Sequence, residues 1–88
     1  MRAIRQVSSF KHDLKKITKR SKDLDKLYEV VEKLAKDIKL EAHHRPHKLI
    51  GNYAEKMECH IEPDWLLIYE VTDELVILYR TGTHSDLF

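Results

Sequence analysis

The sequence has 88 residues, a single cysteine and a formal net charge of +1 at pH 7. A chain of this length forms one domain, spanning residues 1–88, with a modest hydrophobic core. One cysteine excludes an intramolecular disulfide, and no apolar stretch approaches the roughly 20 residues of a membrane span. No signal peptide is visible either, so we expect a cytoplasmic protein that does not contact a membrane.

The charge is distributed unevenly along the chain. Residues 1–22 contain eight lysines and arginines and one acid, Asp13, whereas residues 23–88 contain eight basic and fourteen acidic residues. Such a local excess of positive charge can bind phosphate groups even when the total charge is near zero. A solvated helix surface remains the alternative interpretation on charge alone.

The first half of the chain predicts a strand followed by two helices. Residues 1–7 alternate weakly between apolar and polar side chains, as in a strand. Ser8 or Ser9 is expected to cap the first helix, and Ser21 the second, because a hydroxyl accepts hydrogen bonds from the free amides of a first turn. The apolar stripes of the two helices are Phe10, Leu14 and Ile17 in the first and Leu24, Leu27, Tyr28, Val31, Leu34, Ala35 and Ile38 in the second. We expect the helices to form an antiparallel hairpin on one face of a sheet.

The second half of the chain predicts a run of strands. A polar, histidine-rich connection over residues 40–48 leads into a short strand near residues 47–51, with residues 52–56 as its return. Further strands are expected at residues 57–62, 66–71 and 75–84, followed by a short tail at residues 85–88. The run from Leu66 to Val71 is almost continuously apolar, which is typical of a strand covered on both faces. The fold class is therefore α+β, with two N-terminal helices packed on a small, mainly antiparallel, twisted β-sheet.

The dipeptide Pro63-Asp64 predicts a tight turn between two of these strands. Proline fixes φ, and aspartate can bond to its own backbone. The turn would bring His60, Asp64 and Trp65 together at one end of a hairpin, while Cys59 points to the opposite, buried face. A base, an acid and an aromatic ring at a strand corner indicate a functional site rather than packing alone.

Four segments together resemble the YafQ branch of the RelE superfamily. They are His60–Trp65 (HIEPDW), Arg80–His84 (RTGTH), the terminal Leu87-Phe88 and the upstream His47–Gly51 (HKLIG). The resemblance covers the whole chain in order and length. It implies a RelE-like fold and the toxin of a type II toxin–antitoxin pair, a ribosome-dependent endoribonuclease (mRNA interferase) that inhibits translation. The alternative is a non-catalytic binding module of the same fold, sequestered by an antitoxin-like partner.

The residue types suit RNA cleavage without a cofactor. In this reaction the ribose 2′-hydroxyl attacks the adjacent phosphate, while a base removes its proton and an acid protonates the leaving oxygen. Histidine suits both proton roles because its ordinary pKa lies near neutrality. The candidate catalytic residues, which are also those that the resemblance implies, are His47, His60, Asp64 and His84. We expect His84 to be the general acid, His60 with Asp64 to serve the base side, and His47 to share base or phosphate-stabilising work.

Three further residues are candidates for positioning the substrate, and each has a structural alternative. Trp65 and Phe88 could stack on a base, and Arg80 could clamp a phosphate. Trp65 could instead belong to the core, and Phe88 could be a hydrophobic plug. Arg80 could instead pair with Glu70 or Glu58 across the strands.

The histidine-rich connection leaves a metal site as an alternative. His43, His44 and His47 could approach one another, with Cys59 or His84 completing a tetrahedral zinc site. The spacing matches no standard zinc pattern, so we expect no metal and no other cofactor.

The resemblance also implies partners. They are a cognate antitoxin with a disordered segment that folds on the toxin, the ribosome with its mRNA, and DNA contacted indirectly through the antitoxin. The resemblance favours ribosomal RNA as the ligand of the basic first helix. The residues expected to make that contact are Lys11, Lys15, Lys16, Lys19 and Arg20.

Overall fold

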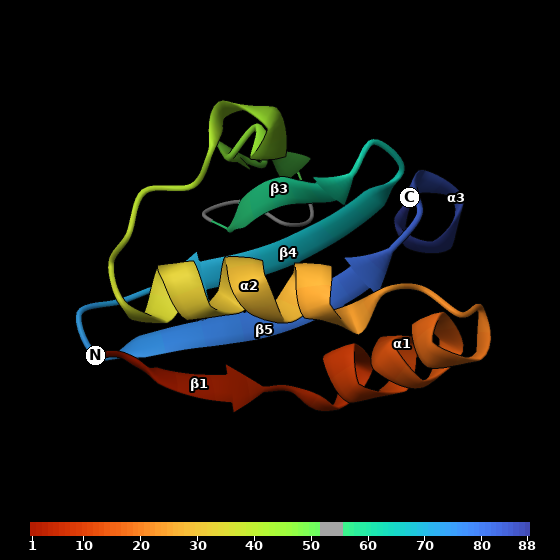
Figure 1. Cartoon of the computed structure of the whole chain (residues 1–88), viewed down its shortest axis with the longest axis horizontal. Helices are drawn as coiled ribbons and strands as arrows, with labels where there is room; N and C mark the ends of the chain where they lie inside the picture. Colours follow the sequence, from red (N-terminus) through yellow and green to blue (C-terminus); the bar gives the residue numbers. More distant parts are fainter. Residues whose placement is uncertain (52–55) are drawn as a thin grey trace.

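The structure is a computed structural model that describes residues 1–51 and 56–88. The described residues contain five strands in one sheet, in the order β1-β5-β4-β3-β2 (Figure 1). They are β1 (Ala3–Gln6), β2 (His47–Lys48), β3 (Met57–Glu62), β4 (Trp65–Val71) and β5 (Leu75–Gly82). Only β1 runs parallel to its neighbour, β5, and the other pairings of these strands are antiparallel. The predicted return at residues 52–56 lies almost wholly outside the described residues.

Two helices, α1 (Ser8–Lys19) and α2 (Leu24–Ala35), pack against the sheet, and Figure 1 shows α2 crossing one face of it. The predicted α+β fold is thereby confirmed. Two shorter elements follow, the 3₁₀ helix η1 (Ala42–His44) and the C-terminal helix α3 (His84–Leu87). No helix in the described part of the chain is both long and apolar enough to cross a membrane.

The predicted serine caps are wrong at both helices. Helix α1 begins after Val7 without a side-chain cap, and Ser9 instead donates its hydroxyl to the carbonyl of Tyr79 at 2.8 Å. Ser21 adopts φ 59° just beyond α1, where the chain reverses, so it cannot start α2. Asp23 caps α2, with its carboxylate accepting from the backbone nitrogen of Asp25 at 3.0 Å.

Helix α2 also ends earlier than its apolar pattern predicts. Asp37 has φ 58°, and the backbone nitrogens of Asp37 and Ile38 donate back to Leu34 and Lys33. This arrangement is a Schellman motif, which satisfies the last carbonyls and stops the helix. Ile38 consequently lies outside the helix, with 51% of its surface exposed.

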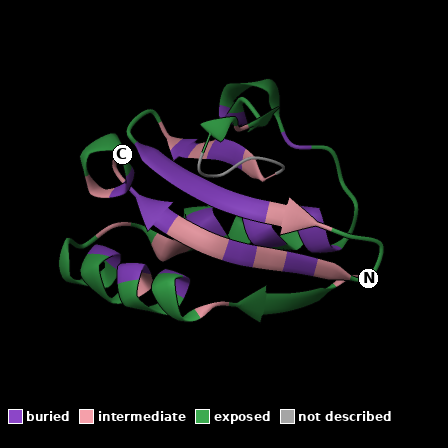
Figure 2. Cartoon of the chain, turned by 180° about the vertical axis from the view of Figure 1, so that it is seen from behind, coloured by how far each residue is buried: buried purple, intermediate pink, exposed green. Residues whose placement is uncertain are grey.

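The sheet is covered unequally on its two faces. The larger core lies between the sheet and the two long helices and includes Phe10, Ile17, Leu27, Val30, Val31, Leu34, Cys59, Ile61, Trp65, Leu67, Tyr69, Val76 and Leu78. The opposite face carries a smaller cluster, in which Leu66 and Ile68 of β4 contact Leu87 of α3. Strand β4 is therefore buried on both sides, as its apolar run predicts (Figure 2).

The last residues form a helical turn rather than the predicted tail. Thr83 and Asp86 make a reciprocal capping box, in which each side chain accepts from the other residue's backbone nitrogen. Leu87 is buried against β4, and this contact fixes the end of the chain over the smaller cluster. The capping box has consequences for the functional site because His84 is the first residue of α3.

Candidate active site

Three histidines and one phenylalanine form a row of rings. The ring centroids of His47 and His60 are 6.4 Å apart, those of His60 and His84 are 6.1 Å apart, and those of His84 and Phe88 are 6.4 Å apart. These residues come from β2, β3, α3 and the C-terminus. The structure therefore brings together the three histidines that the sequence singled out, although 37 positions separate the first from the last.

The hairpin of β3 and β4 determines where His60 lies. Cys59 and Ile61 belong to the core under the helices, so His60, which lies between them, projects to the other face. The pairing with β4 shifts register between His60 and Glu62, as a β-bulge does. Beyond the bulge the chain turns, and Nδ1 of His60 lies 3.2 Å from the carbonyl oxygen of Pro63.

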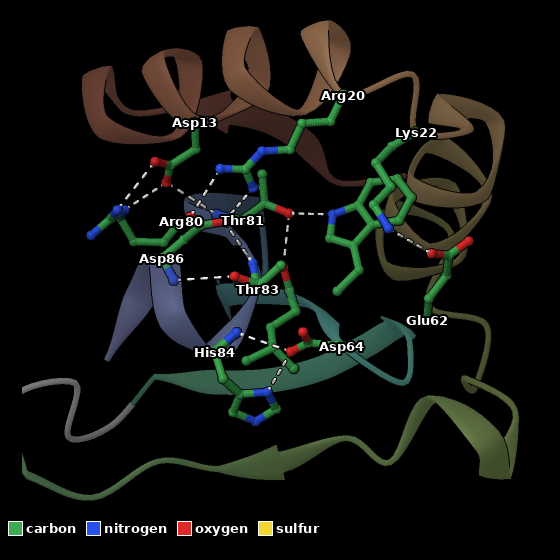
Figure 3. Close-up of polar contacts among 12 residues, drawn as sticks. Asp13, Arg20, Lys22, Glu62, Asp64, Arg80, Thr81, Thr83, His84 and Asp86 are labelled. Carbon is green, nitrogen blue, oxygen red and sulfur yellow. Dashed lines mark hydrogen bonds and ion pairs between the residues drawn. The ribbon is translucent and has the colours of Figure 1, made fainter.

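Asp64, in this turn, binds His84 rather than His60 (Figure 3). Its Oδ1 accepts from the backbone nitrogen of His84 at 3.1 Å and lies 2.9 Å from Nδ1 of the His84 ring. The hydrogen bond with the His84 side chain, and then that with its backbone, lowers the pKa of Asp64. The prediction that Asp64 supports His60 is wrong, because the turn directs this carboxylate across to the start of α3.

The contact with Asp64 also fixes which nitrogen of His84 is open. A carboxylate accepts hydrogen bonds, so the Nδ1 that faces it carries the proton. The remaining ring nitrogen, Nε2, faces away, and the His84 side chain is 56% exposed. His84 can therefore exchange a proton with a ligand through Nε2 while Asp64 holds its ring.

Glu58 is the site residue that sequence reasoning missed. Its Oε1 lies 3.2 Å from Nε2 of His47 and 3.9 Å from Nε2 of His60, and its side chain is only 7% exposed. Its position two residues before His60 on the same strand was the available signal. The β2–β3 register, in which His47 faces Glu58, could not be obtained from the sequence.

His47 is held at both ring nitrogens. Nε2 faces the carboxylate of Glu58, and Nδ1 lies 2.8 Å from the carbonyl oxygen of Arg45. Both partners are hydrogen-bond acceptors, so the two contacts fix the orientation of the His47 ring beside His60. A role for His47 as a base or in stabilising a phosphate remains a prediction.

Trp65 does not offer a surface for stacking. It is 1% exposed, and its indole nitrogen donates to the hydroxyl of Thr81 at 2.9 Å. That hydroxyl donates in turn to the carbonyl of Leu66 at 2.8 Å. The prediction that Trp65 contacts substrate is therefore wrong, and its structural alternative is correct, because Trp65 is a core residue that ties β4 to β5.

Arg80 is bound by an acid of α1 rather than by the predicted strand partners. Its Nε and Nη2 donate to the carboxylate of Asp13 at 2.6 and 3.1 Å (Figure 3). Asp13 is 3% exposed and also accepts from the backbone nitrogen of Thr81. Glu70, one of the predicted partners, instead accepts from the hydroxyl of Tyr79. Arg80 thus has a fixed orientation at the edge of β5, and a phosphate-binding role for it remains a prediction.

The remaining predicted residues divide into two groups. Lys11, Lys15, Lys16 and Lys19 are exposed on α1, and Phe88 is 64% exposed beside His84. Arg20 differs, because its guanidinium binds the carboxylate of Asp86 with contacts of 2.6 and 3.1 Å. An exposed Phe88 does not act as a hydrophobic plug, so that alternative is wrong.

The histidine-rich segment does not form the alternative zinc site. In the described ranges, no group of three or more histidine, cysteine or acidic side chains is arranged to hold a metal ion. Cys59 is buried on the opposite face, where burial raises the pKa of its thiol to about 12. His44 is buried as well, and burial lowers its pKa. The ring of His44 also makes a tilted stack with the ring of His43, with centroids 4.1 Å apart.

A sequence model of the family described as "Bacterial toxin of type II toxin-antitoxin system, YafQ" matches residues 2–88. The chain belongs to the YafQ family. The mRNA interferase toxin YafQ of Escherichia coli K12 is 39% identical to this YafQ-family chain over 88 residues, which are 99% of the chain and 96% of that protein.

Solved structures of relatives share the fold. The toxin in the E. coli DinJ–YafQ toxin–antitoxin complex is 39% identical, with a TM-score of 0.90 over 99% of this chain and 97% of that one. A copper-bound mutant toxin from Helicobacter pylori is 38% identical, with a TM-score of 0.94 over the full length of both chains. These similarities confirm the family and the fold that the sequence motifs predict.

Proposed function

We propose that this YafQ-family toxin is a ribosome-dependent endoribonuclease that cleaves mRNA in the cytoplasm and so inhibits translation. The observation that carries the proposal is the placement of His60 and His84 on one surface, with ring centroids 6.1 Å apart and a separate carboxylate beside each ring. Two imidazoles at this separation can flank a single phosphodiester, one for each proton transfer.

The reaction follows from these two positions. His60 takes the proton of the ribose 2′-hydroxyl, and the oxygen attacks the adjacent phosphorus. The bond from phosphorus to the 5′-oxygen breaks, and His84 gives that oxygen a proton from Nε2. The products are a 2′,3′-cyclic phosphate and a fragment with a 5′-hydroxyl, so no water is consumed in the cleavage step.

The carboxylates and the remaining site residues support these transfers. Asp64 holds the His84 ring and stabilises its charged form, and Glu58 stabilises charge on His60 and His47. His47 and Arg80 would supply positive charge to the phosphorane, whose negative charge exceeds that of the phosphate. The exposed ring of Phe88, next to His84, would stack on a base and hold the nucleotide in line.

The ribosome would supply the substrate and most of the binding energy. Four exposed lysines on α1, namely Lys11, Lys15, Lys16 and Lys19, form a positive surface suited to ribosomal RNA. In the E. coli relative the toxin is bound by the antitoxin DinJ. We extend this to a cognate antitoxin for the present chain, and to indirect DNA binding through that partner.

The end groups of the cleaved mRNA test the proposal. Ribosomes carrying an mRNA in the decoding site would be incubated with the toxin, and both new ends would be identified by sequencing. A 5′-hydroxyl on the downstream fragment and a cyclic or 3′-phosphate on the upstream one are expected. A 5′-phosphate would contradict the mechanism, and the absence of cleavage by the wild-type chain would favour the non-catalytic binding module.

A metal requirement is tested separately, because the H. pylori relative has been crystallised with copper. The toxin alone would be treated with a chelator, desalted and then added to intact ribosomes. An unchanged single-turnover rate is expected, since side chains provide both the acid and the base. Loss of cleavage, restored by adding a metal ion back to the toxin, would overturn metal-independent catalysis.

A further inference from the structure

The helix that carries His84 is too short to be stable by itself. Helix α3 has only four residues, His84–Leu87. Isolated helices of this length do not form in water, so other contacts must hold it. The position of His84 therefore depends on what fixes this turn.

The capping box supplies the first constraint on α3. The backbone nitrogen of Thr83 donates to Asp86 Oδ2 at 2.9 Å, and the backbone nitrogen of Asp86 lies 3.2 Å from Thr83 Oγ1. Gly82 makes room for the Asp86 side chain, because a Cβ at this position would lie 2.9 Å from Asp86 Oδ2. The chain immediately before His84 is thus packed directly against Asp86.

Arg20, which follows α1 directly, supplies the second constraint on α3. Its Nη1 donates to Asp86 Oδ2 at 2.6 Å and its Nη2 to Oδ1 at 3.1 Å, so both carboxylate oxygens are engaged (Figure 3). The Arg20 side chain is 43% exposed, and that of Asp86 is 17% exposed. The contact links the C-terminal end of α1 to α3 across 66 positions of sequence.

We propose that Arg20 and Asp86 are positioning residues for His84, and that Arg20 does not serve as a contact to ribosomal RNA. The bidentate pair holds the turn that contains His84, so that the His84 backbone nitrogen and ring both meet Asp64. A partly exposed ion pair contributes little stability by itself, so its main effect here is on geometry. The proposal rests on the function assigned above to His84.

Two substitutions at the pair have a matched control elsewhere on the surface. Arg20→Gln removes the charge and the bidentate contact, whereas Arg5→Gln removes the same charge at an exposed position of β1, outside the lysine surface of α1. Asp86→Asn keeps an oxygen for the backbone nitrogen of Thr83 but weakens the bond to Arg20. Arg20→Lys retains the charge and one donor, so it should restore part of the function.

Single-turnover cleavage at saturating ribosomes separates positioning from binding. We expect Arg20→Gln and Asp86→Asn to slow cleavage at least ~10-fold, since small displacements of a catalytic group have effects of this size or larger. Ribosome affinity should fall no more in Arg20→Gln than in Arg5→Gln. If Arg20→Gln binds ribosomes more weakly than the control but cleaves at the wild-type rate when saturated, Arg20 contacts RNA and the proposal is wrong.

A second measurement does not depend on cleavage. The ¹⁵N shifts of the His84 ring report which nitrogen carries the proton, and a pH titration reports how Asp64 affects the ring. We expect the Nδ1-protonated form to lose population in Arg20→Gln and in Asp86→Asn but not in Arg5→Gln. Unchanged ring signals in both variants would overturn the positioning role. If His84→Ala were fully active, the proposed function would fail. The His84 ring signals of the wild type, Arg20→Gln and Asp86→Asn would still show whether the Arg20–Asp86 ion pair holds His84.

Discussion

Asp64 binds His84 through one carboxylate oxygen, which accepts from the backbone nitrogen at 3.1 Å and lies 2.9 Å from Nδ1 of the ring. This one oxygen therefore fixes both the backbone position of His84 and the orientation of its ring. The arrangement resembles the way a carboxylate orients the histidine of a hydrolytic triad, with Nε2 left for the reaction. His84 thus meets a charged acceptor at Nδ1, whereas Nδ1 of His60 meets the backbone carbonyl oxygen of Pro63.

Removal of either proton carrier should abolish toxicity. We expect His84→Ala and His60→Ala each to lower single-turnover cleavage by about 10²–10⁴-fold, the usual contribution of a general acid or base. Both side chains lie on the surface of the site rather than in the core, so circular dichroism and the melting temperature should be almost unchanged. Growth arrest on expression provides the first screen.

Asp64→Asn should have a smaller effect than either histidine variant. The amide can still accept from the His84 backbone, but it loses the charge that stabilises an imidazolium. We expect the cleavage rate to fall about 10-fold, because an opposite charge within about 4–6 Å favours the charged form of an imidazole by at least about this factor. Asp73→Asn, at an exposed carboxylate in the turn between β4 and β5, is the control and should leave the rate unchanged. Equal rates for the two variants would show that the Asp64 contact does not matter to the chemistry.

Glu58→Gln tests the residue that only the structure identifies. The substitution keeps shape and removes the buried charge between His47 and His60. We expect cleavage to slow by roughly 10–100-fold with ribosome affinity unchanged, because an opposite charge within about 4–6 Å favours the charged form of an imidazole by factors of this size. Glu62→Gln is the matched control on the same strand, because its carboxylate binds Lys22 and Lys26 instead. A wild-type rate in Glu58→Gln would exclude the carboxylate from the mechanism.

Local patterns in the sequence predicted much of this molecule. The alternation of Cys59, His60 and Ile61 gave the correct faces of β3, and the apolar run after Trp65 gave a strand buried on both sides. The apolar stripes placed both long helices. Each of these features depends on residues that are neighbours in the chain, so periodicity suffices to find it.

The assignment of carboxylates to cations could not be predicted in the same way. Asp13 binds Arg80 across 67 positions, and Arg20 binds Asp86 across 66. These pairs depend on strand order and helix placement, and several acids in the sequence could have met each cation. The same reasoning explains the error at Asp64, whose partner His84 lies 20 positions away, whereas His60 is close in sequence.

Charge reversal on α1 should weaken ribosome binding without changing the chemistry. Replacing Lys15, Lys16 and Lys19 together by glutamate removes three exposed cations from the helix. Affinity should fall at least ~10-fold near physiological salt, and its dependence on salt should become shallower, because fewer counterions are released. Pull-down at several salt concentrations measures both quantities. Unchanged affinity would place the ribosome contact on another surface.

Trp65→Phe should affect stability rather than substrate handling. The phenylalanine keeps most of the apolar contact but removes the donor to Thr81, a buried hydroxyl. Leaving a buried acceptor unsatisfied costs about 1–3 kcal/mol, so the urea midpoint should fall. The cleavage rate of the folded protein should stay near that of the wild type. A large loss of rate with unchanged stability would restore the stacking role that the buried position argues against.

The stability of the chain should depend on pH through Asp86. The hydrogen bond from Arg20, and then that from the backbone of Thr83, holds the pKa of this carboxyl well below its usual range. In the unfolded chain an aspartate titrates near about 3.9. A carboxyl whose pKa is lower in the folded state stabilises the fold above that unfolded value, and this contribution disappears as the pH falls toward the folded pKa.

Asp86→Asn should therefore be less stable than the wild type at pH 7, by about 0.5–1 kcal/mol if the loss resembles that of other weakened caps. The difference between the two proteins should narrow below about pH 4. Urea unfolding of both proteins between pH 2.5 and pH 7 measures the difference directly, and a gap that stays constant over this range would mean that the Asp86 charge does not stabilise the fold.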